Sequence, residues 1–189
     1  MSADNTTELV LVVLGFALVA GGLGWSPYGR AIWAPVSAGA LASAAVLAAV
    51  SDDLSHDRVE VTVLVILAGL LAVVGGGPVT TRVFAFVDRA DRADRDRQLD
   101  QQTLAQAGLV LRGGAWIGAL ERAAVFAGLA AGFPGGLAVV LALKGVGRFQ
   151  DLRGDGTGQG ATTERFIIGT FTSVLWAAAC AGMVALVRR

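Results

Sequence analysis

The stretch GAWIGALERAAVFAGLAAGFPGGLAVVLALKGVGRF (residues 114–149) decides how the C-terminal part of the chain folds. It is strongly apolar, but a short break interrupts it near its middle. The break consists of Gly132, Phe133, Pro134, Gly135 and Gly136. Proline ends a helix and glycine suits a tight turn. The stretch is therefore predicted to form a helical hairpin, whose first helix, over residues 115–132, would be about 27 Å long.

The composition indicates a membrane protein. Of the 189 residues, 54% are hydrophobic and only 16% are charged, and the mean hydropathy is +0.65, whereas a soluble domain is roughly 25% charged. Five runs of 21 or 22 residues contain no Asp, Glu, Lys or Arg, and about 20 apolar residues cross a bilayer as a helix. These runs are 9–29, 31–51, 61–81, 123–143 and 166–187.

Because the fourth run is the broken one, we expect an all-α, polytopic transmembrane bundle of about six membrane helices, in which the fourth and fifth form the hairpin. A soluble helical protein is excluded, because five such runs would leave almost no polar surface to face water. The formal net charge is zero and the chain has no basic stripe, which argues against a nucleic-acid partner.

The positive charges predict the orientation, because cytoplasmic loops retain Lys and Arg. With the hairpin, 11 of the 15 Lys and Arg residues lie on one side, three lie on the other, and Arg122 lies within a span. With a single straight helix in its place, the split would be only 9 to 5. The hairpin topology puts both termini outside and both long polar loops in the cytoplasm. A shallow re-entrant hairpin would give the same sides.

The chain divides into two halves around a charged connector. Residues 1–82 hold three spans, residues 83–112 form the connector, and residues 113–189 hold the hairpin and the last span. The connector repeats an Asp-Arg unit with opposite charges four residues apart, such as Asp88 and Arg92, which suits a solvated helix continuing the third span. A docking site for a cytosolic partner is the alternative. Within the third span, the run from Gly75 to Pro78 is expected to produce a kink.

Four charges inside the oily stretch come level with one another if the hairpin turns at Pro134. They are Glu121, Arg122, Lys144 and Arg148. Glu121 lies 13 residues before the turn and therefore faces the neighbourhood of residue 147, near the cytoplasmic ends of both helices. Ionisable groups within spans are costly and are a default functional hypothesis. Two interpretations stay open: a structural clasp that locks the hairpin, or a cluster that also handles an ion, a proton or an anionic headgroup.

No catalytic or metal-binding constellation can be assembled from the sequence. His56 is the only histidine and lies among Asp52, Asp53 and Asp57, where an acidic cation site is the minor alternative. Cys180 is the only cysteine and is expected to pack as a small apolar group. We therefore predict no catalytic residues, no metal and no cofactor.

Three separated motifs occur in order in the second half of the chain. They are RGGAWIGALER (112–122), LKGVGR (143–148) and ERFIIGT (164–170). Over residues 109–182 the chain resembles a family of uncharacterised bacterial, chiefly actinobacterial, multi-pass membrane proteins. The resemblance implies an integral protein of the bacterial plasma membrane. Its charged motif positions add Glu164 and Arg165 to the four charges above, which implies a cluster of six charges on one side.

Two functions are consistent with this pattern. The first is a structural or accessory membrane subunit, whose charges fasten helices or bind a partner or lipid headgroups. The second is a small transporter or channel component that moves an ion or proton past Glu121. The expected partners are the lipid bilayer and another membrane protein or a second copy of the chain.

Overall fold

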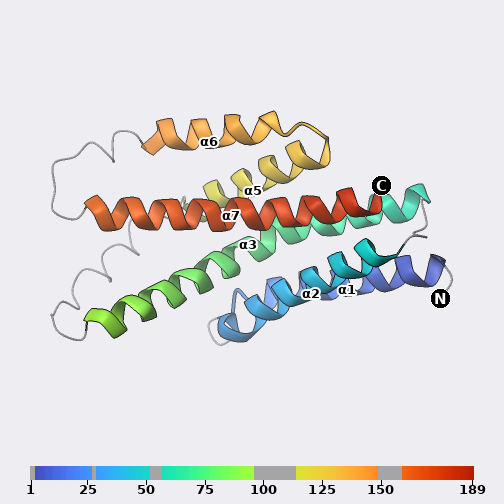
Figure 1. The fold of residues 1–189 in the computed structure, drawn as a ribbon, viewed down its shortest axis with the longest axis horizontal. Helices are drawn as coiled ribbons and strands as arrows, with labels where there is room; N and C mark the ends of the chain where they lie inside the picture. The colour runs from blue at the N-terminus through green and yellow to red at the C-terminus, as the bar shows by residue number, and fades with distance from the viewer. Residues whose placement is uncertain (1–2, 27–28, 52–56, 96–113, 149–158) are drawn as a thin grey trace.

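The computed structural model describes residues 3–26, 29–51, 57–95, 114–148 and 159–189. This part of the chain is all helical (Figure 1). The helices are α1 (Ala3–Leu23), α2 (Arg30–Val50), α3 (Arg58–Arg95), α5 (Gly114–Ala130), α6 (Gly135–Arg148) and α7 (Gln159–Val187). The expected helical bundle is therefore confirmed.

Four helices are long and apolar enough to cross a membrane. Their apolar segments are Asn5–Leu23, Ala31–Val50, Arg58–Arg89 and Thr163–Val187. The hairpin helices are shorter, with 17 residues in α5 and 14 in α6. At 1.5 Å per residue these helices are about 26 and 21 Å long, less than the roughly 30 Å of a bilayer core.

The large apolar side chains that face outward also indicate a membrane protein. On α1, Val12, Phe16 and Val19 are between 52% and 67% exposed, and comparable residues line the outside of the other helices. A soluble protein rarely leaves such continuous apolar surface uncovered. The interior, by contrast, is rich in alanine and other small residues, which allow helices to approach closely in lipid.

The predicted break forms the turn between α5 and α6. The first helix ends at Ala130, two residues earlier than predicted, because Gly132 adopts a φ of 75°. The amides of Gly132 and Phe133 donate to the carbonyls of Leu129 and Gly128, at 3.0 and 2.8 Å. These two bonds are the Schellman arrangement that ends a helix at a left-handed glycine. Pro134 then lies directly before the start of α6.

The hairpin turn, both ends of the chain and the start of α3 lie at one end of the bundle (Figure 1). The end of α3, the end of α6 and the start of α7 lie at the other end. This arrangement agrees with the connectivity predicted for a hairpin. Arg188, after the last turn of α7, donates to the carbonyl of Ala130 at 2.9 Å and so ties α7 to the end of α5.

The core is shared by five helices, and α6 lies outside it. The buried apolar residues come from α1, α2, α3, α5 and α7. In α6 only partly buried side chains, Leu137 and Val140, pack against this core. The hairpin therefore attaches to the bundle mainly through α5, which contacts α3, α6 and α7.

Helix α3 is continuous from Arg58 to Arg95, so the predicted extension into the connector is confirmed as far as Arg95. The remainder of the connector, residues 96–112, lies outside the described residues. The helix changes direction near its middle (Figure 1), close to the glycine run that ends at Pro78, as predicted.

Each glycine of this run faces at least one large side chain from another part of the chain. A Cβ added to Gly75 would lie 2.7 Å from the ring of Trp176, and one on Gly77 would lie 2.7 Å from the ring of Trp25. A Cβ on Gly76 would lie 2.3 Å from Cδ of Arg122. Any larger residue would displace these side chains. The glycines are therefore a packing surface as well as a flexible point in the helix.

Candidate functional site

The carbonyl groups next to the glycine run accept hydrogen bonds from side chains of other elements. Pro78 has no N–H, so the carbonyl of Val74, four residues earlier, loses its donor within the helix. The indole Nε1 of Trp25, between α1 and α2, donates to that carbonyl at 2.9 Å. One turn earlier, the indole Nε1 of Trp176 on α7 donates to the carbonyl of Leu71 at 3.1 Å.

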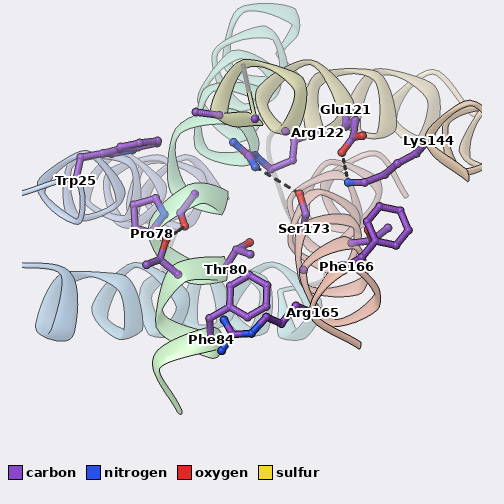
Figure 2. Close-up of a pocket in the computed structure, with 17 residues that line it drawn as sticks. Trp25, Pro78, Thr80, Phe84, Glu121, Arg122, Lys144, Arg165, Phe166 and Ser173 are labelled. Carbon is purple, nitrogen blue, oxygen red and sulfur yellow. Dashed lines mark hydrogen bonds and ion pairs between the residues drawn. The ribbon is translucent and has the colours of Figure 1, made fainter. Parts of the chain in front are cut away.

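Arg122 on α5 makes the third contact of this kind. Its Nε and Nη2 donate to the carbonyl of Val73 at 3.2 and 2.9 Å, and its Nη1 donates to Oγ of Ser173 at 3.4 Å (Figure 2). The residue is only 5% exposed. Within the described residues, no carboxylate lies within 4.0 Å of its guanidinium. Arg122 therefore joins α5 to α3 and α7 through neutral acceptors, and its guanidinium forms no ion pair there.

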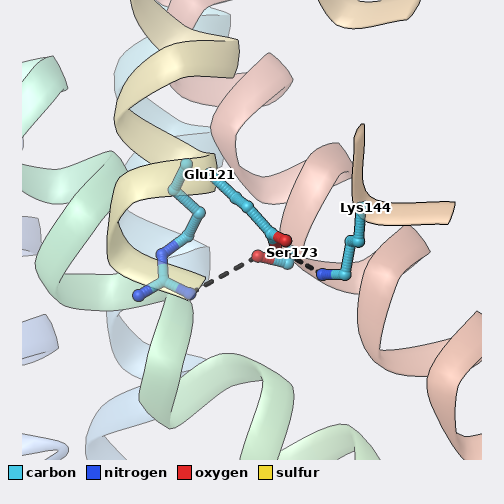
Figure 3. Close-up of polar contacts among 4 residues, drawn as sticks. Glu121, Lys144 and Ser173 are labelled. Atoms are coloured by element: carbon cyan, nitrogen blue, oxygen red, sulfur yellow. Dashed lines mark hydrogen bonds and ion pairs between the residues drawn. The ribbon is translucent and has the colours of Figure 1, made fainter. Parts of the chain in front are cut away.

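Glu121, the adjacent residue, is directed toward α6. Its Oε2 accepts a hydrogen bond from Nζ of Lys144, and the two form an ion pair between the hairpin helices (Figure 3). The side chains of Lys144 and Glu121 are 20% and 15% exposed. The hairpin prediction that Glu121 comes level with Lys144 is confirmed. Lys144 also lies 5.7 Å from the ring centre of Phe166 on α7, within cation-π range.

Arg165 fastens a different pair of helices. Its Nη2 donates to Oδ1 of Asp88, so this ion pair joins α7 to the extended part of α3. The guanidinium also lies 5.9 Å from the ring centre of Phe84. Sequence reasoning considered Asp88 only as part of a solvated repeat. Because α3 continues as a helix beyond the span, the carboxylate of Asp88 reaches α7 instead.

Four of the six charges predicted to cluster lie around one pocket, but their side chains bond to different helices. Glu121 and Lys144 form a pair, whereas Arg122 is directed to α3 and α7 and Arg165 to Asp88. Adjacent residues of a helix point about 100° apart, which explains why Glu121 and Arg122 serve different interfaces.

Two members of the predicted set are not placed in this site. Glu164 is exposed on α7, and it lies within that helix, which begins at Gln159, five residues earlier. Helix α6 ends at Arg148, but the side chain of Arg148 lies outside the described part of the structure. The break residues, from Gly132 to Gly136, form the turn between α5 and α6.

Four of the predicted charges line one pocket between α3, α5, α6 and α7 (Figure 2). They are Glu121, Arg122, Lys144 and Arg165. The pocket has a volume of about 380 Å³ and is also lined by Trp25 and by the hydroxyl residues Thr80, Thr81, Thr170 and Ser173. Sequence reasoning missed these polar residues, since a Ser or Thr in an apolar run carries no signal of what it faces.

The described residues contain no group of three or more His, Cys, Asp or Glu side chains that could hold a metal. His56 and its neighbours Asp52 and Asp53 lie outside the described residues. Cys180 is a free, buried thiol in α7, packed in the apolar core as expected.

Comparison of the chain with protein families, with curated proteins and with solved structures finds no match. The resemblance to the bacterial membrane protein family, and the function it implies, therefore stay predictions.

Arg122→Gln is expected to destabilise the bundle more than Arg165→Gln does. The first change removes the donors that join three helices and leaves the buried hydroxyl of Ser173 without its donor, and an orphaned buried polar group costs roughly 1–3 kcal/mol. The second removes an ion pair whose Arg side chain is 45% exposed, and exposed pairs contribute about 1 kcal/mol or less.

The measurement is the thermal unfolding midpoint of each purified variant in the same detergent. Equal losses, or a larger loss in Arg165→Gln, would contradict the role assigned to Arg122.

Proposed function

We propose that the chain is a structural or accessory subunit of a membrane assembly, whose intramembrane charges fasten its helices. The observation that supports this most strongly is that the buried Arg122 bonds to two other helices at once. The Glu121–Lys144 pair joins α5 to α6, and the Arg165–Asp88 pair joins α7 to α3. Each of these charged contacts therefore crosses between helices.

The proposed setting is the plasma membrane of a bacterium, crossed several times by the chain. The four long apolar helices support a membrane location. The excess of Lys and Arg on one side supports a cytoplasmic position for the end of the bundle that carries the charges, with both termini outside. The proposed partners are the surrounding lipid and either another membrane protein or a second copy of the chain.

A second candidate function is movement of an ion or proton past Glu121. It is favoured by one observation: the carboxylate lines a polar pocket instead of facing lipid. Its pairing with Lys144 favours a fastening role instead, because a carboxylate held by a cation is less free to exchange ligands.

Glu121→Gln separates the two functions. If the carboxylate fastens the hairpin, the variant should have a lower unfolding midpoint, and vesicles containing either form should show no ion or proton flux above protein-free vesicles. Glu164→Gln is the matched control, since it makes the same change at an exposed position of α7 and should leave the midpoint unchanged. A wild-type flux that is lost in Glu121→Gln at unchanged stability would support transport and contradict the fastening role.

Cysteine labelling tests the proposed orientation. Phe133, at the hairpin turn, is 62% exposed, and the native Cys180 is buried in the core. A membrane-impermeant maleimide should label Phe133→Cys from outside intact cells. It should label Gln102→Cys, in the charged connector, only after the membrane is permeabilised. The reverse pattern would contradict the orientation.

A further inference from the structure

The pocket beside Arg122 has a buried positive charge that forms no ion pair within 4.0 Å among the described residues, since the nearby carboxylate of Glu121 is paired with Lys144. Val73 and Ser173 supply neutral oxygens. A guanidinium has five N–H donors, and the three bonds to these residues leave two unused. Removing a charge from water is costly unless an opposite charge or water compensates, and more so inside a membrane. The position of Arg122 on the pocket wall gives an anion access to it.

A second polar group on the same wall has no hydrogen-bond partner within the described part of the chain. The Oγ1 of Thr170 is buried and makes no hydrogen bond there, and Thr170 lines the pocket. Thr170 lies three residues before Ser173 on α7, so the two side chains share one face of that helix. A buried hydroxyl without a partner is uncommon in proteins and calls for a ligand or an ordered water.

Small residues keep the guanidinium accessible from the pocket. Gly118 lies one turn before Arg122 on α5, and a Cβ there would come within 3.2 Å of Nη1 of Arg122. Gly114 and Ala115 continue the same open wall. The volume of about 380 Å³ falls within the range of roughly 300–1,000 Å³ typical of small-ligand sites.

The other charges of the pocket favour an anion over a cation. Arg122, Lys144 and Arg165 outnumber the single acidic lining residue, Glu121. Lys144 and Arg165 are partly exposed and already have acidic partners, so they would attract an anion toward the buried Arg122 more than bind it directly.

We infer that this pocket binds a phosphate-type oxyanion, with the guanidinium of Arg122 and the hydroxyl of Thr170 as its direct ligands. Arginine offers parallel donors to two oxygens of such a group, and a hydroxyl can donate to a third. The phosphate can belong to a lipid headgroup or be free in solution, since both present the same oxygens. The inference rests on the proposed function in one respect: it assigns a ligand to charges that also fasten helices.

The test uses the full chain with two probes. The first is inorganic phosphate, titrated calorimetrically into the chain in a neutral detergent. The second is phosphatidylglycerol. The chain is reconstituted in phosphatidylcholine vesicles that either contain or lack phosphatidylglycerol, and the lipid that stays bound to the chain is identified by native mass spectrometry. Binding of inorganic phosphate would identify a free anion, and retention of phosphatidylglycerol alone would identify a headgroup.

Thr170→Val is the decisive variant. The hydroxyl has no partner within the described fold, so its removal should not lower the unfolding midpoint. It should weaken binding of the effective probe about fivefold to tenfold, the value of one hydrogen bond. Thr172→Val is the matched control on the same helix, because its hydroxyl donates to the carbonyl of Ile168 at 2.8 Å and it does not line the pocket. The Thr172→Val variant should bind the effective probe with the affinity of the wild type.

Arg122→Lys provides a second readout, because it keeps the charge but loses the paired donors, and it should also weaken binding. Absence of binding by both probes, or affinities that are equal in the wild type and Thr170→Val, would overturn the inference and indicate that water alone fills the site. This result would leave the fastening role intact if Glu121→Gln still lowers the unfolding midpoint. Conversely, probe binding with no effect of Glu121→Gln on stability would support the anion site and contradict the fastening role.

Discussion

The structure depends on the carbonyl groups of one turn of α3 that accept hydrogen bonds from outside that helix. In lipid, backbone polar groups have no water to bond, so a carbonyl freed by a proline must find a donor in the protein. Pro78 frees the carbonyl of Val74, which accepts from Trp25. The carbonyls of Leu71 and Val73, in the same turn, accept additional hydrogen bonds from Trp176 and Arg122. The glycines that follow leave room for these three side chains. One short segment therefore brings α7, α5 and the α1–α2 turn together.

This constraint explains how the charges are distributed. Once Arg122 is directed into the bend of α3, the preceding residue must point to another side of α5, where α6 lies. Glu121 then meets Lys144 and holds α6, which otherwise contributes only partly buried side chains to the core. The charges that look like one cluster in the sequence thus hold separate interfaces. The pocket is the space between those interfaces, and its most buried charge, on Arg122, is the one that forms no ion pair among the described residues.

The sequence was sufficient for the features that follow from local rules. Helix class follows from apolar runs long enough to span a bilayer, and the hairpin follows from Pro134 between glycines. The level of Glu121 relative to Lys144 follows from residue counts on either side of the turn. Each of these needs only the rise per residue of a helix and the chemistry of helix breakers.

The remainder depends on tertiary contacts that no local pattern reports. The run from Gly75 to Pro78 was interpreted as a kink, whereas its function as a packing surface depends on Trp25, Arg122 and Trp176, all of them distant in the sequence. Likewise, the residue counts correctly predict that Glu121 lies level with Lys144 along the hairpin. They do not predict the direction in which Arg122 points around the axis of α5. That direction depends on which neighbours offer acceptors, and these are the carbonyl of Val73 on α3 and the hydroxyl of Ser173 on α7.

The most direct test of this account is a double-mutant cycle between Trp25→Phe and Pro78→Ala, read as unfolding free energy in detergent. An alanine in place of Pro78 would supply the missing N–H to the carbonyl of Val74, so the indole would no longer be its only strong donor. The account predicts that Trp25→Phe costs about 1 kcal/mol more in the wild type than in the Pro78→Ala background, the value of one hydrogen bond. Equal costs in both backgrounds would contradict the claim that the carbonyl freed by Pro78 is satisfied by the indole of Trp25.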